Sequence, residues 1–380
     1  MPNVQDTSIF ATAPTGASQP DSITTGNGSI WVEYGDGAQS DGSSGSSTIV
    51  QYNLLGNTQN TYTIPGLADG LKFDPATGDV WALQNQDGNS TLTLINPATN
   101  QVSAPLSYAP PYVYGADSTR GYDDVAFKGQ QVFLSYTNPA NPGDPVIQEL
   151  TNGTAPFGSL QTTDVLRLGD TGTNLATGAT NQPLPVTDPD SLKLLPDGSL
   201  ILTGEHDKAF TFISNPGTAQ QSASFIALPS SSTSPDDAVM PTATSGTFYI
   251  SNQNSNDIVA AQVTGLNTGD LYASVGSAVD QIDPTTGTET PIITGLNAAH
   301  GLIFVPASSG SLDLAGLLQS ISQDIAAAFA NVGSLAAPSS APASLGATLT
   351  ASTPSPTFIA NLVSSSASNT LSSIIPTAQS

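Results

Sequence analysis

A polar residue followed by a short apolar run recurs six times along this chain. The polar residue is an aspartate in five copies and a histidine in the sixth. The copies lie about 45–65 residues apart, a spacing typical of β-sheet blades repeated around an axis. The pattern predicts an all-β fold, a six-bladed β-propeller, with seven blades as the alternative. The six copies are Asp21-Ser22-Ile23, Asp69-Gly70-Leu71, Asp124-Val125-Ala126, Asp190-Ser191-Leu192, Asp237-Ala238-Val239 and His300-Gly301-Leu302.

Five copies are followed by a turn and a second apolar run, the pattern of two antiparallel strands. The copy at Asp237 has its second run at 247–250. The copy at His300 has none after it, and the strands expected at 269–273 and 278–282 come before it. Ring closure accounts for this order. The strand at 301–305 would complete a blade whose remaining strands come from the other end of the chain.

The two ends of the chain differ from its middle. Residues 1–19 are rich in Thr, Ala and Pro and are expected to form an N-terminal arm, and residues 20–306 carry the strand signals of the propeller. Residues 311–333 have apolar side chains at spacings of three and four, which predicts an amphipathic helix. Residues 334–380 form an uncharged tail rich in Ala, Ser, Pro and Thr. Self-association or a protein partner could use residues 311–380 or the arm; alternatively, the helix packs on the propeller.

The net charge of the chain narrows the range of expected binding partners. Only 9% of the residues are charged, and 30 acids against 6 bases give a net charge of −24. Nucleic acids and anionic membranes require a basic surface, so neither is an expected partner, whereas cations are. The chain has no cysteine, which excludes disulfides and thiolate metal sites. No apolar run is long enough to span a membrane.

The composition also bears on localisation. No basic residue precedes Lys72 and no long apolar run opens the chain, so a cleaved N-terminal signal peptide is not expected. Acidic, lysine-poor and cysteine-free chains of this kind resemble bacterial proteins that are exported in one step on a C-terminal signal. We therefore expect an extracellular protein, with a cytoplasmic protein of unusual surface as the alternative.

The recurring polar residues are expected to meet at one mouth of the central tunnel. The strand nearest the axis opens each blade, so its first residue faces the tunnel. The ring would consist of Asp21, Asp69, Asp124, Asp190, Asp237 and His300, thickened by Asp123 and Asp236. Two roles fit: each aspartate accepts hydrogen bonds from the next blade and locks the ring, or the carboxylates bind a hard cation such as Ca²⁺.

The loops after the second strands bring further polar residues to the same mouth. They carry Glu33, Asn85, Asn138, Glu205-His206 and Asn252. In this respect residues 20–306 resemble, at the level of the fold, the six-bladed propellers of the regucalcin, gluconolactonase and paraoxonase group. The resemblance implies a Ca²⁺ ion held by a Glu, one or two Asn and an Asp. The matching residues here would be Glu33 or Glu205, Asn85, Asn138, Asn252 and a ring acid such as Asp237. The chain also resembles the NHL and YVTN-type repeat propellers, many of which only bind partners.

Two functions remain open at this point. The first is an extracellular propeller that is stabilised by a cation and acts as a binding or self-assembly module. The alternative is a Ca²⁺-dependent lactonase or esterase with its site at the tunnel mouth. In that case the metal polarises the carbonyl, and the catalytic candidates are Glu205, His206 and His300. The sequence contains no phosphate-binding glycine loop, no Gly-x-Ser-x-Gly and no His-Glu-x-x-His motif.

Overall fold

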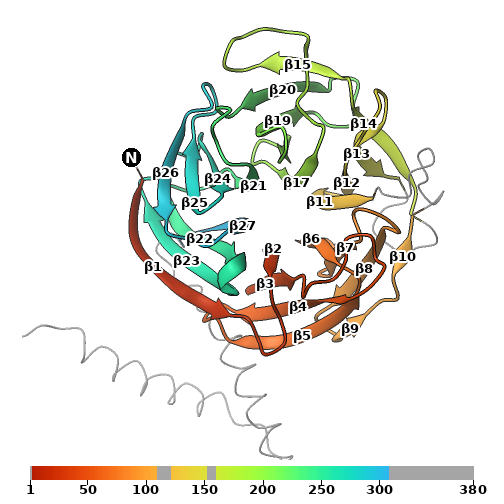
Figure 1. The fold of residues 1–380 in the computed structure, drawn as a ribbon, viewed down its shortest axis with the longest axis vertical. Helices are drawn as coiled ribbons and strands as arrows, with labels where there is room; N and C mark the ends of the chain where they lie inside the picture. The colour runs from red at the N-terminus through yellow and green to blue at the C-terminus, as the bar shows by residue number, and fades with distance from the viewer. Residues whose placement is uncertain (1, 109–120, 152–159, 308–380) are drawn as a thin grey trace, which may run out of the picture. The chain divides into compact units, whose positions relative to one another are not determined.

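The computed structural model describes residues 2–108, 121–151 and 160–307. In these ranges the chain forms six β-sheets arranged around a central axis (Figure 1). The fold is therefore the predicted six-bladed propeller rather than the seven-bladed alternative. The predicted helix at 311–333 and the tail at 334–380 lie outside the described residues. Within the described residues, no helix is long and apolar enough to cross a membrane.

Blades one to four follow the chain order from the innermost strand outward, except that two outer strands of blade four precede its innermost strand. Blade one contains β2 (Pro20–Gly26), β3 (Ser29–Tyr34), β4 (Ser46–Asn53) and β5 (Thr58–Pro65). Blade two contains β6 (Ala68–Phe73), β7 (Val80–Gln84) and β8 (Thr91–Asn96), and the short β9 (Gln101–Val102) and β10 (Leu106–Ser107) both pair with β8. Blade three contains β11 (Tyr122–Lys128), β12 (Gln131–Tyr136), β13 (Pro145–Leu150) and β14 (Thr162–Arg167). Blade four contains β17 (Pro189–Leu194), β18 (Leu200–Gly204), β19 (Ala209–Ser214) and β20 (Ser222–Ala227), extended by β15 (Thr171–Asn174) and β16 (Gln182–Pro183).

Blades five and six are interleaved along the chain. Blade five contains β21 (Pro235–Val239), β24 (Leu271–Val275), β25 (Ala278–Ile282) and β26 (Glu289–Thr294). Blade six contains β27 (Ala299–Pro306), β22 (Ser245–Asn252), β23 (Asp257–Thr264) and β1 (Asn3–Thr12). The chain thus leaves blade five after one strand, builds two strands of blade six, and then returns. Figure 1 shows β1 beside β23 at the outer edge of blade six.

This topology corrects two expectations from the sequence. The run at 247–250 lies in β22 and pairs with β27 rather than with β21, and the second strand of blade five is β24. The strand at 301–305 does complete a blade with the other end of the chain, but β1 is the single strand which that end supplies. Residues 3–12, within the expected arm, are therefore a strand paired antiparallel with β23.

The hydrophobic core lies between neighbouring blades, because each sheet presents apolar side chains to the next. Trp31 and Trp81 are almost completely buried. Trp81 of blade two meets Phe127 of blade three edge to face, with ring centroids 5.1 Å apart. Such aromatic pairs add about 0.5–1.5 kcal/mol beyond the burial of their area. Phe10 of β1 makes a similar contact with Tyr249 of β22, with centroids 4.8 Å apart, within the closing blade.

All six innermost strands carry the same β-bulge close to their first residue. In blade one, Pro20 pairs with Tyr34 and Ile23 with Val32, so Asp21 and Ser22 together oppose the single residue Glu33. The registers of the other five blades show the same one-residue shift. A bulge of this kind redirects side chains at the end of a strand. The bulged pairs are Asp21-Ser22, Asp69-Gly70, Asp123-Asp124, Asp190-Ser191, Asp236-Asp237 and His300-Gly301.

Candidate functional site

The first positions of the six bulges form a ring at one mouth of the tunnel. We call this set the acidic ring; its members are Asp21, Asp69, Asp123, Asp190, Asp236 and His300. The five carboxylates line a cavity of about 20 Å³, close to the space that one water molecule requires. The sequence predicted Asp124 and Asp237 as ring members, thickened by Asp123 and Asp236, and all four line this cavity. The register assigns Asp123 and Asp236 to the first bulge position and Asp124 and Asp237 to the second.

Asp124 and Asp237 occupy the second bulge positions, where they lock neighbouring blades together. Asp124 accepts a hydrogen bond from the backbone N–H of Leu192 in blade four at 3.0 Å, and its Oδ2 lies 3.1 Å from Nζ of Lys72 in blade two. Asp237 accepts from the backbone N–H of Leu302 in blade six at 2.7 Å and pairs with Lys193 of blade four. For these two acids the structure shows the locking role.

Two neighbouring lysines favour the ionised form of Asp237. Burial alone would raise the pKa of this carboxyl, but the ammonium groups of Lys193 and Lys72 outweigh that effect and hold the pKa below its ordinary value. The hydroxyl of Ser191 donates a further hydrogen bond at 2.5 Å. Asp237 is therefore a fully engaged anion, with few lone pairs left for a ligand.

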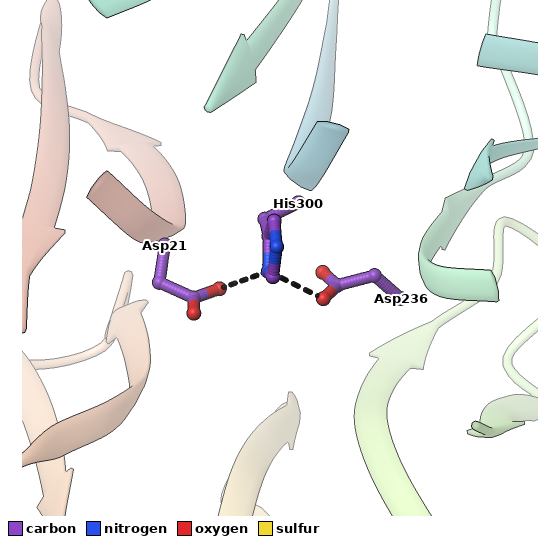
Figure 2. A group of neighbouring side chains, drawn as sticks. All are labelled: Asp21, Asp236 and His300. Atoms are coloured by element: carbon purple, nitrogen blue, oxygen red, sulfur yellow. Dashed lines mark ion pairs between the residues drawn. The ribbon is translucent and has the colours of Figure 1, made fainter. Parts of the chain in front are cut away.

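His300 bridges two members of the acidic ring. Figure 2 shows its Nδ1 between the carboxylates of Asp21 and Asp236, at 3.4 Å and 2.7 Å. The amide of Gln253 donates to the second oxygen of Asp21 at 3.1 Å. Burial alone would lower the pKa of His300, but the hydrogen bonds and charges of both aspartates outweigh it and raise the pKa to about 12. His300 is thus an imidazolium at neutral pH.

The remaining acids of the ring resist ionisation. Burial and the charge of Asp21 raise the pKa of Asp236 to about 7. Burial likewise raises the pKa of Asp69 to about 6, although a hydrogen bond with Asp123 opposes the rise. The pKa values of Asp123 and Asp190 stand well above the ordinary range, because both are buried among like charges. A cation bound at the ring would therefore compete with protons for these carboxylates.

Glu33 is a buried acid directly behind the ring. It stands on β3 opposite the bulge of Asp21, and its side chain has no exposed surface. Burial, followed by the charges of Asp21 and Asp69, raises its pKa well above the ordinary value. No hydrogen bond of ordinary geometry reaches either carboxylate oxygen from the described part of the chain. The Ser47 hydroxyl is the one neighbouring donor that opposes the rise in pKa. A buried carboxyl with so few donors around it is unusual and costly.

The three asparagines suggested by the resemblance stand in different environments. Asn252 uses its whole amide inside the protein: it accepts from the backbone N–H of Asn297 at 2.5 Å and donates to Asp257 at 2.8 Å. Asn138 donates to Asp87 at 3.0 Å. Asn85 donates to the backbone oxygen of Asn89, but its buried Oδ1 has no partner within the described ranges.

Glu205 and His206 follow β18 and are exposed. Loss of solvent around its carboxylate and the charge of Asp188 raise the pKa of Glu205, and the charges of Asp21 and His300 also act on it. Glu205 therefore stands within electrostatic range of the acidic ring. No hydrogen bond within the described residues joins either side chain to the ring.

Two lysines and a glutamine at this site were not predicted. Lys72 and Lys193 come three residues after the ring acids Asp69 and Asp190, on the innermost strands of blades two and four. In a chain with so few basic residues, a lysine three positions after a ring acid in two blades is the sequence feature that indicates their place at this site. Gln253 belongs to a short 3₁₀ turn after β22 and had no sequence signal.

The comparisons with known proteins extend to the fold alone. No protein-family model and no curated protein matches the chain. A crystal structure of virginiamycin B lyase from Staphylococcus aureus is 13% identical with a TM-score of 0.46, covering 80% of this chain and 94% of that one. A periplasmic gluconolactonase from Pseudomonas aeruginosa is 13% identical with a TM-score of 0.45, covering 75% and 88%. The chain resembles these six-bladed propellers as folds, as the sequence predicted for the gluconolactonase type, and similarity at this level is silent on activity.

Proposed function

We propose that this protein is a cation-binding propeller, a module in which a divalent ion at the acidic ring stabilises the fold for binding or assembly. The observation that carries the proposal is Glu33, a fully buried carboxyl behind Asp21 and Asp69 that has only the Ser47 hydroxyl as a neighbouring donor. A cation bound there would partner Glu33 and offset the repulsion between the carboxylates around it.

The donor chemistry favours Ca²⁺. Glu33, Asp21 and Asp69 offer hard carboxylate oxygens, the ligands that Ca²⁺ prefers. The alternative donor set is Asp21, Asp236 and His300, whose ligand atoms lie within 4.8 Å of one another and whose mixed nitrogen and oxygen donors suit a transition metal. His300 is an imidazolium between two carboxylates, so its nitrogen would have to lose a strongly held proton before it could bind metal. The oxygen set beside Glu33 is therefore the better site.

Calorimetric titration of the chelator-treated protein with Ca²⁺ tests this proposal. We expect binding at one site per chain. Glu33→Gln should weaken that binding by about tenfold or more, because it removes one charged ligand. Glu149→Gln on β13 is the matched control and should bind Ca²⁺ as the unaltered protein does. If the chain binds no Ca²⁺, or if both variants bind equally well, the proposal is wrong.

The binding or assembly role rests on composition. The scarcity of charged residues and the uncharged segment after Asp324 motivate an extracellular module that associates through residues 311–380. Sedimentation of the full chain and of a chain ending at residue 310 tests this role. An unchanged oligomeric state and unchanged partner binding would contradict it.

A metal-dependent lactonase or esterase is the second candidate. The Asp236–His300 contact of 2.7 Å favours it, because both side chains remain about one quarter exposed at the mouth. An imidazolium with a pKa of about 12 can donate a hydrogen bond or stabilise an oxyanion, but it cannot act as a base. The base would have to be Glu205, so Glu205→Gln should abolish turnover and preserve the fold. Hydrolysis of a panel of lactones and aryl esters, measured with Ca²⁺ and with chelator, tests this candidate. If no compound is hydrolysed in a metal-dependent way, the candidate is excluded.

A further inference from the structure

A second and larger cavity adjoins the small cavity of the acidic ring, since Ile23 and Lys72 line both. This cavity has a volume of about 310 Å³ and is lined by residues from all six innermost strands. Its walls are mainly apolar and include Phe73, Phe127, Met240 and Phe304. Lys72 lines both this cavity and the small cavity of the acidic ring, so it stands between the two. The cavity therefore combines an apolar chamber with a polar group at the boundary to the ring.

The ammonium group of Lys72 has more N–H donors than acceptors among the described residues. Its side chain is 17% exposed, and its single acceptor among the described residues is Oδ2 of Asp124, at 3.1 Å. An ammonium group has three N–H donors, so two of them remain for a molecule in the cavity. Lys193 differs, because it donates to both the carboxylate of Asp237 and the backbone oxygen of Leu302. Lys72 is therefore the group that would orient a ligand.

Charge indicates the kind of ligand. Lys72 is paired with Asp124, and Lys193 with Asp237, so the two lysines contribute no net positive charge. The acidic ring lies directly beyond Lys72, in a chain of net charge −24. A carboxylate in this cavity would add a further negative charge beside the acidic ring, where like charges repel one another. A neutral oxygen that accepts a hydrogen bond meets no such penalty.

We propose that this cavity binds a neutral, largely apolar small molecule whose carbonyl or ether oxygen accepts a hydrogen bond from Lys72. The cavity is about twice the volume of an engineered 150 Å³ cavity that holds benzene, so it suits a molecule about the size of a substituted naphthalene. The site is separate from the acidic ring and does not depend on cation binding there.

Three probes of nearly the same shape test the proposal on the full chain by equilibrium dialysis. They are 2-acetylnaphthalene, which is neutral with an acceptor oxygen, 2-naphthoate, which is an anion, and 2-isopropylnaphthalene, which has no acceptor. We expect 2-acetylnaphthalene to bind at one site per chain, and about tenfold more tightly than either of the others. Lys72→Met should remove that advantage over 2-isopropylnaphthalene, and the matched control Lys128→Met, outside the cavity, should retain it.

A second variant guards against a change in folding. Met240→Trp fills the cavity without altering the pair of Lys72 and Asp124, and it should reduce the binding of all three probes. Three results would each overturn the proposal: no probe binds the full chain, 2-naphthoate binds as tightly as 2-acetylnaphthalene, or Lys72→Met leaves the preference for 2-acetylnaphthalene intact.

Discussion

Asp123 and Asp124 are adjacent in the bulge of β11, yet their carboxyl groups have different partners. Asp123 lies in the acidic ring, where burial and the charges of Asp69 and Asp190 raise its pKa. Asp124 turns toward its neighbours and accepts hydrogen bonds from the backbone of blade four and from Lys72. The bulge thus divides between two residues the two roles that the sequence analysis considered for one. The carboxyl at the first position lies in the acidic ring, and the carboxyl at the second position joins neighbouring blades.

The first prediction concerns Asp237, which occupies the second position of its bulge. Replacing it with Ala leaves the partly buried ammonium of Lys193 without its carboxylate, with only the backbone oxygen of Leu302 as acceptor, and removes the acceptor of the Leu302 N–H. Loss of one partner of a buried ion pair costs about 3–5 kcal/mol. Urea unfolding should show a fall of that order in the free energy of unfolding. Asp190→Asn is the contrasting variant: it removes a carboxyl whose pKa is raised by burial and by like charges, so stability at pH 8 should not fall.

The fold could be predicted because the recurring pattern, a polar residue followed by a short apolar run, marks every innermost strand at similar spacing. The exchange of strands between blades five and six could not, because 247–250 and Leu271–Val275 are both apolar runs with strand character. Sequence order favours 247–250 as the partner of β21, because it is the nearer of the two runs. Only long-range packing selects Leu271–Val275 instead.

The acids that line the small cavity were all named from the sequence, but the bulge position of each acid in a consecutive pair was not. A bulge shifts the register by one position, and a sequence with two consecutive acids does not reveal which of them faces the tunnel. Glu33 was predicted from its place after Trp31, but the scarcity of donors around its buried carboxyl is a property of packing alone.

The second prediction concerns Gly301, which lies where blade six meets blade one. A Cβ added at Gly301 would lie 2.3 Å from the backbone oxygen of Asp21, far inside contact distance. Gly301→Ala should therefore lower the free energy of unfolding by about 1–3 kcal/mol through overpacking. The control is Gly269→Ala, where the nearest atom would be 3.6 Å away, and its stability should change by less than about 0.5 kcal/mol. Equal effects of the two variants would contradict this account of the blade contact.

The third prediction concerns pH. Asp69, Asp236 and His300 have pKa values of about 6, 7 and 12, each above its value in the unfolded chain. The folded state therefore binds more protons than the unfolded state between pH 5 and 8, and the free energy of unfolding falls as pH rises. Urea unfolding at four pH values across this range measures the slope. Asp237, whose pKa is lowered, contributes stability that is lost only in more acidic solution.

A rise in stability from pH 5 to 8 would show that the ring acids are ionised without penalty. Calcium provides an internal check on the same measurement. If the ring binds the ion, saturating Ca²⁺ should flatten the slope, because the metal replaces the protons that the folded ring retains.

The fourth prediction concerns the ionisation of His300. Its contacts with Asp21 and Asp236 should keep the imidazole doubly protonated from pH 5 to pH 9, which ¹⁵N–¹H NMR of the ring nitrogens reports directly. Asp236→Asn removes the carboxylate at 2.7 Å and should bring the pKa of His300 down toward its ordinary value. Asp207→Asn beside Thr187 is the control, because that carboxylate makes its hydrogen bonds away from the ring, and it should leave His300 unchanged. A neutral His300 at pH 7 in the unaltered protein would contradict the ion pair and would restore this side chain as a metal ligand or general base.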